Sequence, residues 1–238
     1  MKEFIYPGKE LDIFHFAVNW KNYWASRISP YLRGRVLEVG AGIGNNTILL
    51  QSLCRDKLNE WTCLEPDPIF AGKLKQKIDF NNLSVKNNVV NGTLKKFINK
   101  SVYDTIIYID VLEHIEDDFS EIQKASALLS KNGHLIVLSP AHPFLYTEFD
   151  RHIGHYRRYT ISSLRDLNPK NCKTIISTYM DSAGMAASFA NRLLMRQSVP
   201  SIGQIMFWDK FLVRISYFLD ILTAGKIGKS VLYIWEKS

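Results

Sequence analysis

The sequence has few cysteines and no long hydrophobic run. Its cysteines, Cys54, Cys63 and Cys172, are odd in number and lack CxxC spacing, so neither a disulfide framework nor a zinc knuckle is indicated. No run of about 18 uncharged apolar residues is present, which argues against a membrane-spanning helix. The first residues, MKEFIYPGKELDIF, contain acids and a proline and are not typical of a signal peptide. These absences predict a reduced, cytoplasmic protein.

Positive charge is concentrated in the C-terminal third. Residues 151–238 contain 13 Lys and Arg against 5 Asp and Glu, whereas residues 1–150 contain 17 against 18. This asymmetry favours an anionic substrate or a membrane surface, although an ordinary solvated face has the same composition. The length of 238 residues suits one large domain spanning the whole chain, residues 1–238.

A glycine-rich turn lies in residues 35–50, RVLEVGAGIGNNTILL. An apolar, β-branched run precedes the turn and indicates a buried strand, and an apolar helix start follows it. Gly40, Gly42 and Gly44 let the backbone adopt unusual dihedral angles and approach a ligand closely. The turn also presents free N–H groups at a helix N-terminus, so the pattern predicts a nucleotide-type pocket.

The residues around this turn distinguish among nucleotides. A dinucleotide fingerprint requires glycine where Asn45 or Thr47 stands, and the lysine of an NTPase phosphate loop is missing. Glu38 precedes the first glycine by two residues, where an acid disfavours a pyrophosphate and suits a positively charged ligand. The stretch closely resembles the first motif of class I S-adenosylmethionine-dependent methyltransferases. That resemblance implies a cofactor with an ammonium and a sulfonium group.

Two further strand ends carry polar residues in the order that this family shows. Glu65 ends the strand EWTCLE and precedes the turn residue Asp67, and the resemblance implies that Glu65 binds both ribose hydroxyls; a surface acid is the alternative. A third strand ends in Gly92, Thr93 and Leu94. Many relatives have Asp where Thr93 stands, so here a hydroxyl and the Leu94 N–H are expected at the adenine.

The run YDTIIYID at residues 103–110 predicts a central buried strand, followed directly by VLEHI. This D-x-L-E-H ending resembles the family motif in which the backbone of Asp110 and Val111 borders the methionine moiety. His114 then lies under the cofactor, more as a structural histidine than as a base. Upstream, Tyr23 within a predicted helix over residues 11–29 resembles the family's N-terminal cofactor lid, although packing onto the sheet explains it equally well.

The resemblance assigns a set of residues to cofactor binding. They are Tyr23, Glu38, Gly40, Ala41, Gly42, Gly44, Asn46, Glu65, Asp67, Gly92, Thr93, Leu94, Asp110, Val111 and His114.

Strands and helices alternate along the chain. We expect strands over residues 36–39, 60–65, 89–91, 103–110, 134–139, 172–179 and 230–235, and helices over 70–80 and 117–130, the latter capped at Asn132 and Gly133, with residues 81–86 as a loop. The predicted fold is α/β: a Rossmann-like, seven-stranded, mostly parallel sheet with helices on both faces and an antiparallel last strand. Residues 20–140 form its cofactor-binding half and residues 141–238 its substrate-binding half.

The segment PAHPFLYTEFDRHIGHYRRYT, at residues 140–160, follows the fifth strand and is rich in polar and aromatic residues. Loops at the carboxyl end of a parallel sheet carry substrate chemistry. We predict His155 or His142 as the base and Asp150 as its orienting partner. The predicted substrate-binding residues are Tyr146, His152, Tyr156, Arg157 and Arg158.

Within this segment, the paired arginines Arg157 and Arg158 suit an anionic group. The pattern D-x-x-x-G-H-Y-R-R-Y also resembles one in family members near sugar and cell-envelope biosynthesis. A metal bound by His142, Asp150, His152 and His155 is conceivable, but their spacing fits no standard zinc pattern, so no metal is predicted.

A helical insertion is expected between the last two strands, at about residues 181–229. Its segments 185–195 and 205–222 are apolar, aromatic and dotted with cations. Such helices suit peripheral membrane contact or a lipid-linked substrate, whereas core packing or a homodimer interface explains them as well.

The sequence thus predicts an S-adenosylmethionine-dependent methyltransferase. The expected acceptor is a small molecule, methylated on an oxygen of a hydroxylated, glycosyl or anionic group. A non-catalytic relative that binds a partner or a membrane is the alternative. No nucleic acid partner is expected, because no Asn-Pro-Pro-Tyr-like motif for a flipped base follows the fourth strand.

Overall fold

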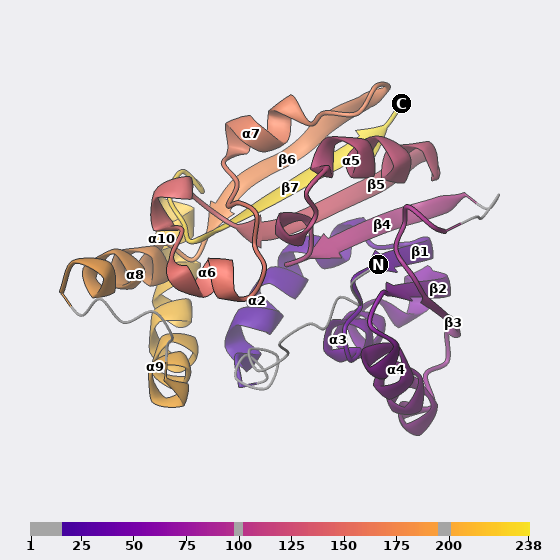
Figure 1. Cartoon of the computed structure of the whole chain (residues 1–238), viewed down its shortest axis with the longest axis horizontal. Helices are drawn as coiled ribbons and strands as arrows, with labels where there is room; N and C mark the ends of the chain where they lie inside the picture. The colour runs from indigo at the N-terminus through magenta and orange to yellow at the C-terminus, as the bar shows by residue number, and fades with distance from the viewer. Residues whose placement is uncertain (1–15, 98–101, 195–200) are drawn as a thin grey trace.

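The computed structural model describes residues 16–97, 102–194 and 201–238, and these form a seven-stranded sheet in the order β3-β2-β1-β4-β5-β7-β6 (Figure 1). The strands are β1 Gly34–Val39, β2 Leu58–Glu65, β3 Lys86–Asn91, β4 Tyr103–Ile109, β5 Leu129–Pro140, β6 Cys172–Met180 and β7 Ser230–Lys237. The first five pair in parallel, and β7 is antiparallel to both β5 and β6. This is the predicted Rossmann-like methyltransferase topology, and the fold prediction is confirmed.

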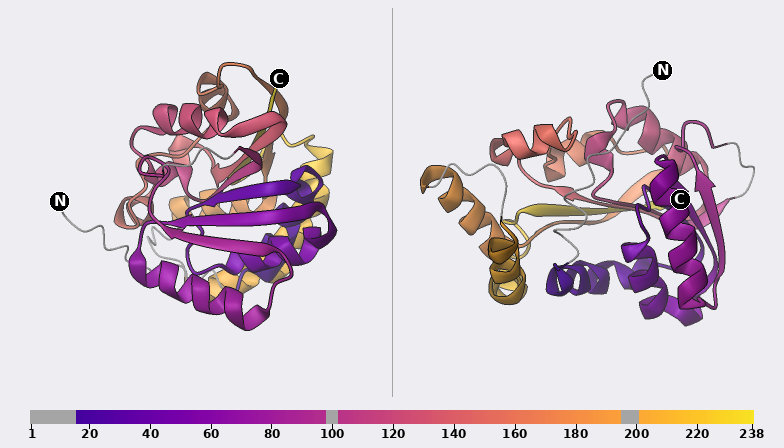
Figure 2. Two further views of the ribbon diagram at one scale, coloured as in Figure 1. Left: turned by 90° about the vertical axis from the view of Figure 1, so that its right-hand side faces the viewer. Right: turned by 60° about the horizontal axis from the view of Figure 1, so that its bottom comes forward.

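Helices connect the strands and cover both faces of the sheet (Figures 1 and 2). The α-helices are α2 Val18–Ile28, α3 Asn45–Cys54, α4 Pro68–Asn81, α5 Asp118–Ala127, α6 Glu148–His152, α7 Ile161–Asp166, α8 Ser182–Leu194, α9 Ile202–Phe207 and α10 Val213–Leu222. Single-turn 3-10 helices are η1 Ser29–Tyr31, η2 Arg55–Lys57, η3 Leu112–His114 and η4 Pro143–Leu145, and the π-helical turn η5 Trp208–Leu212 joins α9 to α10.

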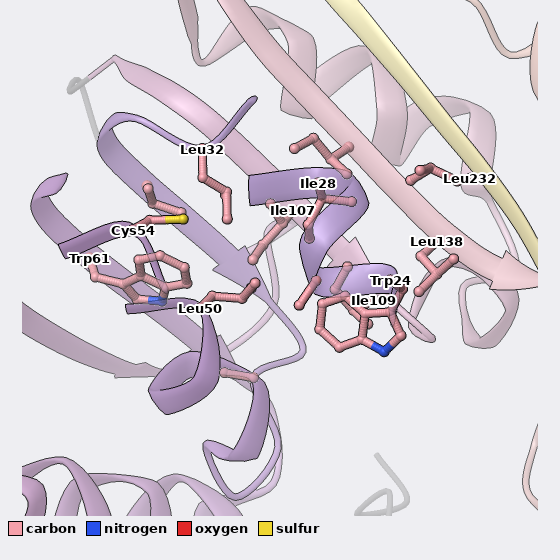
Figure 3. Packing of buried hydrophobic residues seen from close by; sticks show 14 of the residues in the cluster. Trp24, Ile28, Leu32, Leu50, Cys54, Trp61, Ile107, Ile109, Leu138 and Leu232 are labelled. Atoms are coloured by element: carbon pink, nitrogen blue, oxygen red, sulfur yellow. The ribbon is translucent and has the colours of Figure 1, made fainter. Parts of the chain in front are cut away.

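The central strands alternate their side chains between two cores, as the two-residue period of a strand requires. Val36 faces the core under α2, α3 and α4, and Leu37 faces the core under α5 and α7. In β4, Ile107 and Ile109 belong to the first core, which Figure 3 shows with Trp24 of α2 beside them. Because both faces are buried, these strands are mainly apolar, which is why the sequence shows them so clearly.

The helical insertion lies between β6 and β7, as predicted, and comprises α8, α9, η5 and α10. Figure 1 shows α8 and α9 at the end of the molecule farthest from α3 and α4. The insertion packs against α2: the Trp20 ring lies 5.9 Å from that of Trp208, and the Tyr23 ring lies 5.2 Å from that of Tyr217. The first helix and the insertion therefore close one end of the sheet together.

Several element boundaries differ from the prediction, and at β3 and β5 strand pairing extends the sheet. Strand β3 begins at Lys86, within the expected loop, because residues 86–91 pair in register with Glu60–Glu65 of β2. Helix α5 ends at Ala127, and the expected cap residues Asn132 and Gly133 belong to β5, whose first residue pairs with β4. Pairing with a neighbouring strand thus replaces an expected loop residue at the start of β3 and an expected helix end before β5.

The predicted helix over residues 11–29 begins outside the described residues, and the predicted segment 185–195 ends outside them. Within the described ranges, the three cysteines are free and buried, in agreement with the absence of a disulfide framework. No helix there has the length and apolar character needed to cross a bilayer.

Candidate functional site

The glycine turn joins β1 to α3 and is shaped by three left-handed residues. Gly40, Gly42 and Gly44 have φ of +69°, +56° and +84°, a region that disfavours side chains. A Cβ on Gly40 would lie 2.5 Å from Val111 Cγ2, and one on Gly44 would lie 2.5 Å from Leu74 Cδ1. At Gly42, by contrast, no atom of the described residues lies within 4 Å of that position. The protein thus encloses the two outer glycines and leaves open space over the middle one.

Backbone hydrogen bonds hold the turn against the end of β2. Gly40 N and Ala41 N donate to the Leu64 carbonyl at 2.8 and 3.0 Å, and Gly44 N donates to the Ala41 carbonyl at 3.0 Å. The left-handed Gly44 precedes the first residue of α3, and Asn46 lies in the first turn of that helix. A helix N-terminus and its free N–H groups therefore face the same edge of the sheet as the open space.

Glu65, at the end of β2, lies beside the middle glycine. Its two carboxylate oxygens accept from Gly42 N at 2.8 Å and from Asp67 N at 2.9 Å. Burial raises the pKa of Glu65, and these two N–H donors oppose the rise. A carboxylate has about four acceptor positions, so two remain for hydroxyl donors. Asp67 itself caps α4 by accepting from Ile69 N and Phe70 N, so its side chain positions the helix.

The end of β3 lies next to Glu65. Gly92 N donates to the Glu65 carbonyl at 3.0 Å, and no atom of the described residues lies within 4 Å of a Cβ built on Gly92. Thr93 is exposed, whereas Leu94 is buried. The predicted adenine residues therefore line the same open edge as the predicted ribose carboxylate.

Glu38 lies beneath the turn and serves the fold. One of its carboxylate oxygens accepts from Thr47 Oγ1 at 2.6 Å and from Trp61 Nε1 at 2.8 Å, and Cys63 Sγ lies 3.8 Å away. Burial raises the pKa of Glu38 to about 7, although these donors oppose the rise. Strand alternation directs Glu38 toward α3. It was expected to contact a cationic ligand, but it is buried and holds the helix that follows the turn.

Tyr23, the predicted cofactor lid, contacts the helical insertion in this structure. Its hydroxyl donates to Asp220 Oδ2 at 2.8 Å, and its ring packs against Tyr217. Burial and the Asp220 carboxylate together raise the pKa of Tyr23. Tyr23 belongs to the core between α2 and the sheet, which was the alternative expectation, but its hydroxyl and one side of its ring contact the helical insertion, which is distant in sequence.

The end of β4 borders the open space from the other side. Asp110 has φ of +53° and an exposed side chain, and Val111 packs against Gly40. Surrounding protein raises the pKa of Asp110 to about 6, while His155 and Lys229 oppose the rise. The sequence predicted a role only for the backbone of Asp110. In the structure its carboxylate is accessible to solvent, while the protein packed around it raises its pKa. Asp110 is the first residue of the D-x-L-E-H run, and this run is the sequence feature that could have indicated a role for its side chain.

Asp150 organises the segment after β5. Its Oδ1 accepts from Arg158 Nε at 2.9 Å and lies 3.0 Å from His155 Nδ1. Its Oδ2 accepts from Arg158 Nη2 at 3.0 Å and from the Thr147 backbone N at 2.7 Å. Burial alone raises the pKa of Asp150, but the hydrogen bonds from His155 and Arg158 hold it well below its usual range. The predicted role of Asp150 as the partner that orients His155 agrees with these contacts.

Arg157 and Arg158, the predicted anion-binding pair, each bind an acid of the same chain in this structure. Arg158 makes a two-pronged ion pair with Asp150, and only 11% of its side chain is exposed. Arg157 Nη1 lies 2.7 Å from Asp118 Oδ2, and its Nη2 donates to the Glu116 carbonyl. Both guanidinium groups neutralise buried or half-buried acids of the same chain, which the one-dimensional pattern does not reveal.

Glu113 brings a second acid to His155. Its Oε2 accepts from Ser139 Oγ at 2.8 Å, and its Oε1 lies 3.8 Å from His155 Nε2. Burial and the nearby Asp110 raise the pKa of Glu113 to about 7. The His114 ring centroid lies 4.5 Å from that of His155, and burial lowers the pKa of His114 to about 4.

Glu113, His114 and His155 place their ligating atoms within 4.8 Å of one another. This is not the set His142, Asp150, His152 and His155 that the sequence analysis considered for a metal: His152 is exposed, and Asp150 is bound by Arg158.

The remaining predicted residues lie around this cluster in different ways. The His142 ring lies against Tyr179, with ring centroids 4.5 Å apart, and its Nε2 is buried, so it does not face open solvent. Tyr146 Oη donates to the His155 carbonyl at 2.6 Å and fixes that loop. Tyr156 and His152 are exposed. Of the two predicted bases, His155 is the one that has an oriented acid partner.

Lys229, which the sequence analysis did not identify, lies at the start of β7. Its Nζ is 4.8 Å from the centroid of the Trp208 ring, and Trp208 Nε1 donates to Asp181 Oδ2 at 2.7 Å. Burial lowers the pKa of Lys229, and the carboxylates of Asp181, Asp150 and Asp110 act against that. Within the described ranges, no carboxylate oxygen lies within 4 Å of Lys229 Nζ. A lone lysine near a strand gives no sequence signal, so only the fold identifies it.

The parallel sheet with its β7 reversal, the glycine turn at β1 and the acid that ends β2 define a methyltransferase domain. A comparison with family models matches residues 19–172 to the family described as "Methyltransferase domain", and the chain belongs to this family. A comparison with curated protein sequences gave no match.

Solved structures share the fold at low sequence identity. A putative sarcosine dimethylglycine methyltransferase from Galdieria sulphuraria is 16% identical with a TM-score of 0.62, over 93% of this chain and 86% of that one. Coclaurine N-methyltransferase, bound to N-methylheliamine and SAH, is 15% identical with a TM-score of 0.64, over 93% and 72% of the chains. The N-methyltransferase NodS from Bradyrhizobium japonicum, in complex with S-adenosyl-L-homocysteine, is 14% identical with a TM-score of 0.59, over 93% and 87%.

Proposed function

We propose that this chain binds S-adenosylmethionine over the glycine turn and transfers its methyl group to a small molecule. The observation that carries the proposal is the open space over Gly42, with the Glu65 carboxylate hydrogen-bonded to the N–H of the same glycine. A nucleoside fits a backbone without side chains flanked by an acid that retains acceptor positions. Two solved methyltransferases of this fold carry S-adenosylhomocysteine, which supports the same cofactor here.

Each strand end has a separate part in holding this cofactor. Glu65 accepts the ribose hydroxyls, and the Leu94 N–H with the Thr93 hydroxyl meets the adenine edge. Asp110 and Val111 border the methionine end, where the exposed Asp110 carboxylate suits positive charge. When bound, the cofactor supplies a methyl group on a sulfonium that is already reactive toward displacement. The protein then needs to align the acceptor and to take up its proton.

We propose a hydroxyl group as the acceptor and His155 as the group that receives its proton. The Asp150 carboxylate accepts from Nδ1 of His155, which leaves Nε2 as the proton acceptor. An imidazolium formed there lies between Asp150, at 3.0 Å, and Glu113, at 3.8 Å, so two acids stabilise the positive charge. The same three-part arrangement of acid, histidine and acceptor serves other enzymes that deprotonate hydroxyl groups.

Lys229 replaces the arginine pair as the proposed binding group for an anionic acceptor, such as a carboxylate or phosphate. Its ammonium lies over the Trp208 ring and is electrostatically coupled to Asp110. The two arginines predicted for this role are already paired within the chain, Arg157 with Asp118 and Arg158 with Asp150.

The test measures cofactor binding and turnover separately. Calorimetry with S-adenosylmethionine compares the wild type with Glu65→Gln, and Glu60→Gln, in the same strand but paired with Arg35 and Lys86, is the matched control. We expect the Kd of Glu65→Gln to be roughly 10-fold to 100-fold higher, since hydrogen bonds to a charged acceptor are lost. Equal affinity in all three proteins would contradict the proposed cofactor site.

Turnover is followed with radiolabelled cofactor and a panel of hydroxylated, anionic and glycosyl metabolites, with His155→Ala as the inactive variant. Labelled product that depends on His155 supports methyl transfer. Tight cofactor binding without labelled product from any acceptor would instead favour the non-catalytic alternative.

A further inference from the structure

One helical segment of the insertion turns polar residues inward. Residues 202–222 run through α9, η5 and α10 without interruption. On the buried side, Asp209 accepts from the backbone N atoms of Asn19 and Trp20, at 3.1 and 2.8 Å, and so holds the start of α2. Asp220, on the same side, accepts from Tyr23 and from the backbone N atoms of Asp181 and Ser182. Both acids of this segment are therefore used inside the protein.

The outward side of the same segment is apolar. The exposed large side chains are Ile202, Met206, Phe207, Phe211, Ile215, Tyr217, Phe218, Leu219, Ile221 and Leu222, each between 36% and 80% exposed. Phe207 and Phe211 stack on each other, with ring centroids 5.3 Å apart. A surface helix of a globular protein ordinarily shows the reverse pattern, with apolar residues inward. A contiguous exposed apolar face of this kind marks an interaction surface.

The charges that accompany this apolar face have one sign. Among residues 201–226, the exposed ionisable side chains are Lys210, Arg214 and Lys226, because Asp209 and Asp220 are buried. Lys210 Nζ lies 5.7 Å from the centroid of the Phe211 ring, so its stem follows the aromatic surface while its ammonium reaches solvent. Aromatic and aliphatic side chains with long cations beside them are the composition of helices that lie in a lipid interface.

We propose that residues 202–222 form a docking face for an anionic lipid bilayer. On docking, the apolar side chains of α9 and α10 enter the boundary between headgroups and acyl chains, while Lys210 and Arg214 meet lipid phosphates. The helix lies in the plane of the membrane, since no helix of the described ranges is long and apolar enough to cross it. Figure 1 shows α9 at the lower left of the molecule, away from α4.

Charge distinguishes this occupant from a second copy of the chain. A two-fold interface brings each face against itself, so Lys210 and Arg214 would meet the same cations of the other copy. The described part of this face offers no exposed acid to pair with them, whereas anionic lipid headgroups do. The proposal is independent of the proposed methyl transfer, because it uses none of the residues assigned to the cofactor or to the acceptor.

The experiment is flotation of the full chain with vesicles of phosphatidylcholine alone or of phosphatidylcholine with phosphatidylglycerol. We expect the wild type to float with the anionic vesicles and to be released as salt concentration rises. The variant Lys210→Glu/Arg214→Glu should partition at least roughly tenfold more weakly, since each cation contributes about 1 kcal/mol at an anionic surface. The variant Phe211→Gln/Phe218→Gln/Leu222→Gln should lose binding to the anionic vesicles even at low salt, because the side chains that enter the lipid are removed.

Matched controls use equally exposed residues on α4, at the other end of the molecule. Ile69→Gln/Phe80→Gln changes side chains that are 66% and 89% exposed, and Lys75→Glu changes an exposed cation. These controls should float like the wild type, and all variants should keep the wild-type melting temperature. Equal flotation of controls and face variants, or no flotation of the wild type, would overturn the proposal. A concentration-dependent dimer that only the triple variant abolishes, without lipid binding, would assign the face to a second copy instead.

Discussion

The two sides of the proposed site are built from different material. On the cofactor side, the ends of β1, β2 and β3 present backbone groups and one carboxylate, and the glycine turn defines the shape. On the acceptor side, residues 140–160 present side chains that mainly bind one another: Asp150 holds His155 and Arg158. A site made of backbone can be recognised from glycine spacing. A site made of mutually paired side chains shows its residue types in the sequence but not their roles.

The comparison also explains which charges are available to a ligand. Arg157 and Arg158 lie next to each other in sequence, but each neutralises an acid of its own. Lys229 comes from the far end of the chain and has no carboxylate within 4 Å among the described residues. In a folded domain, the charge that remains for a substrate is the one left after internal pairing. The following changes test this difference between the two sides.

Removing the imidazole of His155 should have the largest effect on activity. His155→Asn keeps a side-chain donor for Asp150 but removes the proton acceptor, so kcat should fall by roughly 10²-fold to 10⁴-fold, the usual contribution of general-base catalysis. The Kd for cofactor should stay unchanged, because the turn at Gly42 lies on the other side of the site. Steady-state kinetics with labelled cofactor and calorimetry measure the two quantities. A loss of affinity that matches the loss of kcat would contradict this division.

The two arginines should differ in their effect on stability. Arg158→Ala leaves the buried Asp150 carboxylate without its ion pair, which should lower the free energy of unfolding by about 3–5 kcal/mol. Arg157→Ala removes a half-exposed ion pair to Asp118 and should cost about 1 kcal/mol or less. Urea denaturation of both variants provides the comparison. Equal losses of unfolding free energy would contradict the larger role assigned to the buried ion pair between Arg158 and Asp150.

The glycines should separate folding from ligand binding. Gly40→Ala forces a Cβ against Val111 at positive φ, and it should lower the free energy of unfolding by about 2–4 kcal/mol. Gly42→Ala meets no described protein atom, so its cost should be the backbone term of about 1–2 kcal/mol, together with a clear loss of cofactor affinity. Thermal unfolding and calorimetry report on the two effects. Normal cofactor binding by Gly42→Ala would remove the main support for the proposed function.

Glu38 should make stability depend on pH. Its pKa is about 7 in the folded protein against an ordinary value of 4.5, so the folded state keeps a proton that the unfolded chain has lost between these values. Its contribution to stability is therefore full below pH 4.5 and is lost as pH rises through 7. Glu38→Gln should flatten the curve of unfolding free energy against pH in this window. An unchanged slope in the variant would show that Glu38 titrates normally.

Chelation should have the smallest effect. The sequence predicts no metal, and we expect dialysis against EDTA to leave methyl transfer unchanged. Chelation is an informative test because Glu113, His114 and His155 lie close enough together to hold a cation. Activity that is lost on chelation and restored by a divalent ion would assign these three residues as metal ligands and would replace the proposed base.

Local patterns were sufficient for much of the fold and for the cofactor side. Strands buried on both faces are mainly apolar, and the left-handed positions at Gly40, Gly42 and Gly44 favour glycine, so both features can be recognised in the sequence. Element ends were less predictable: β3 begins at Lys86 and α5 ends at Ala127 because partner strands extend the sheet there. Pairing with a distant segment has no local signature.

The sequence by itself determined the order of strands and helices, the glycine turn and the acid at the end of β2, since these follow from periodicity and from backbone conformations that few residues tolerate. Only the tertiary structure decided that Tyr23 donates to Asp220, that Glu38 supports α3, that both arginines bind acids of the chain and that Lys229 lies over the Trp208 ring. The reason is that the partner of a polar side chain is fixed by which strands and helices meet in space, and these contacts join residues up to 197 positions apart.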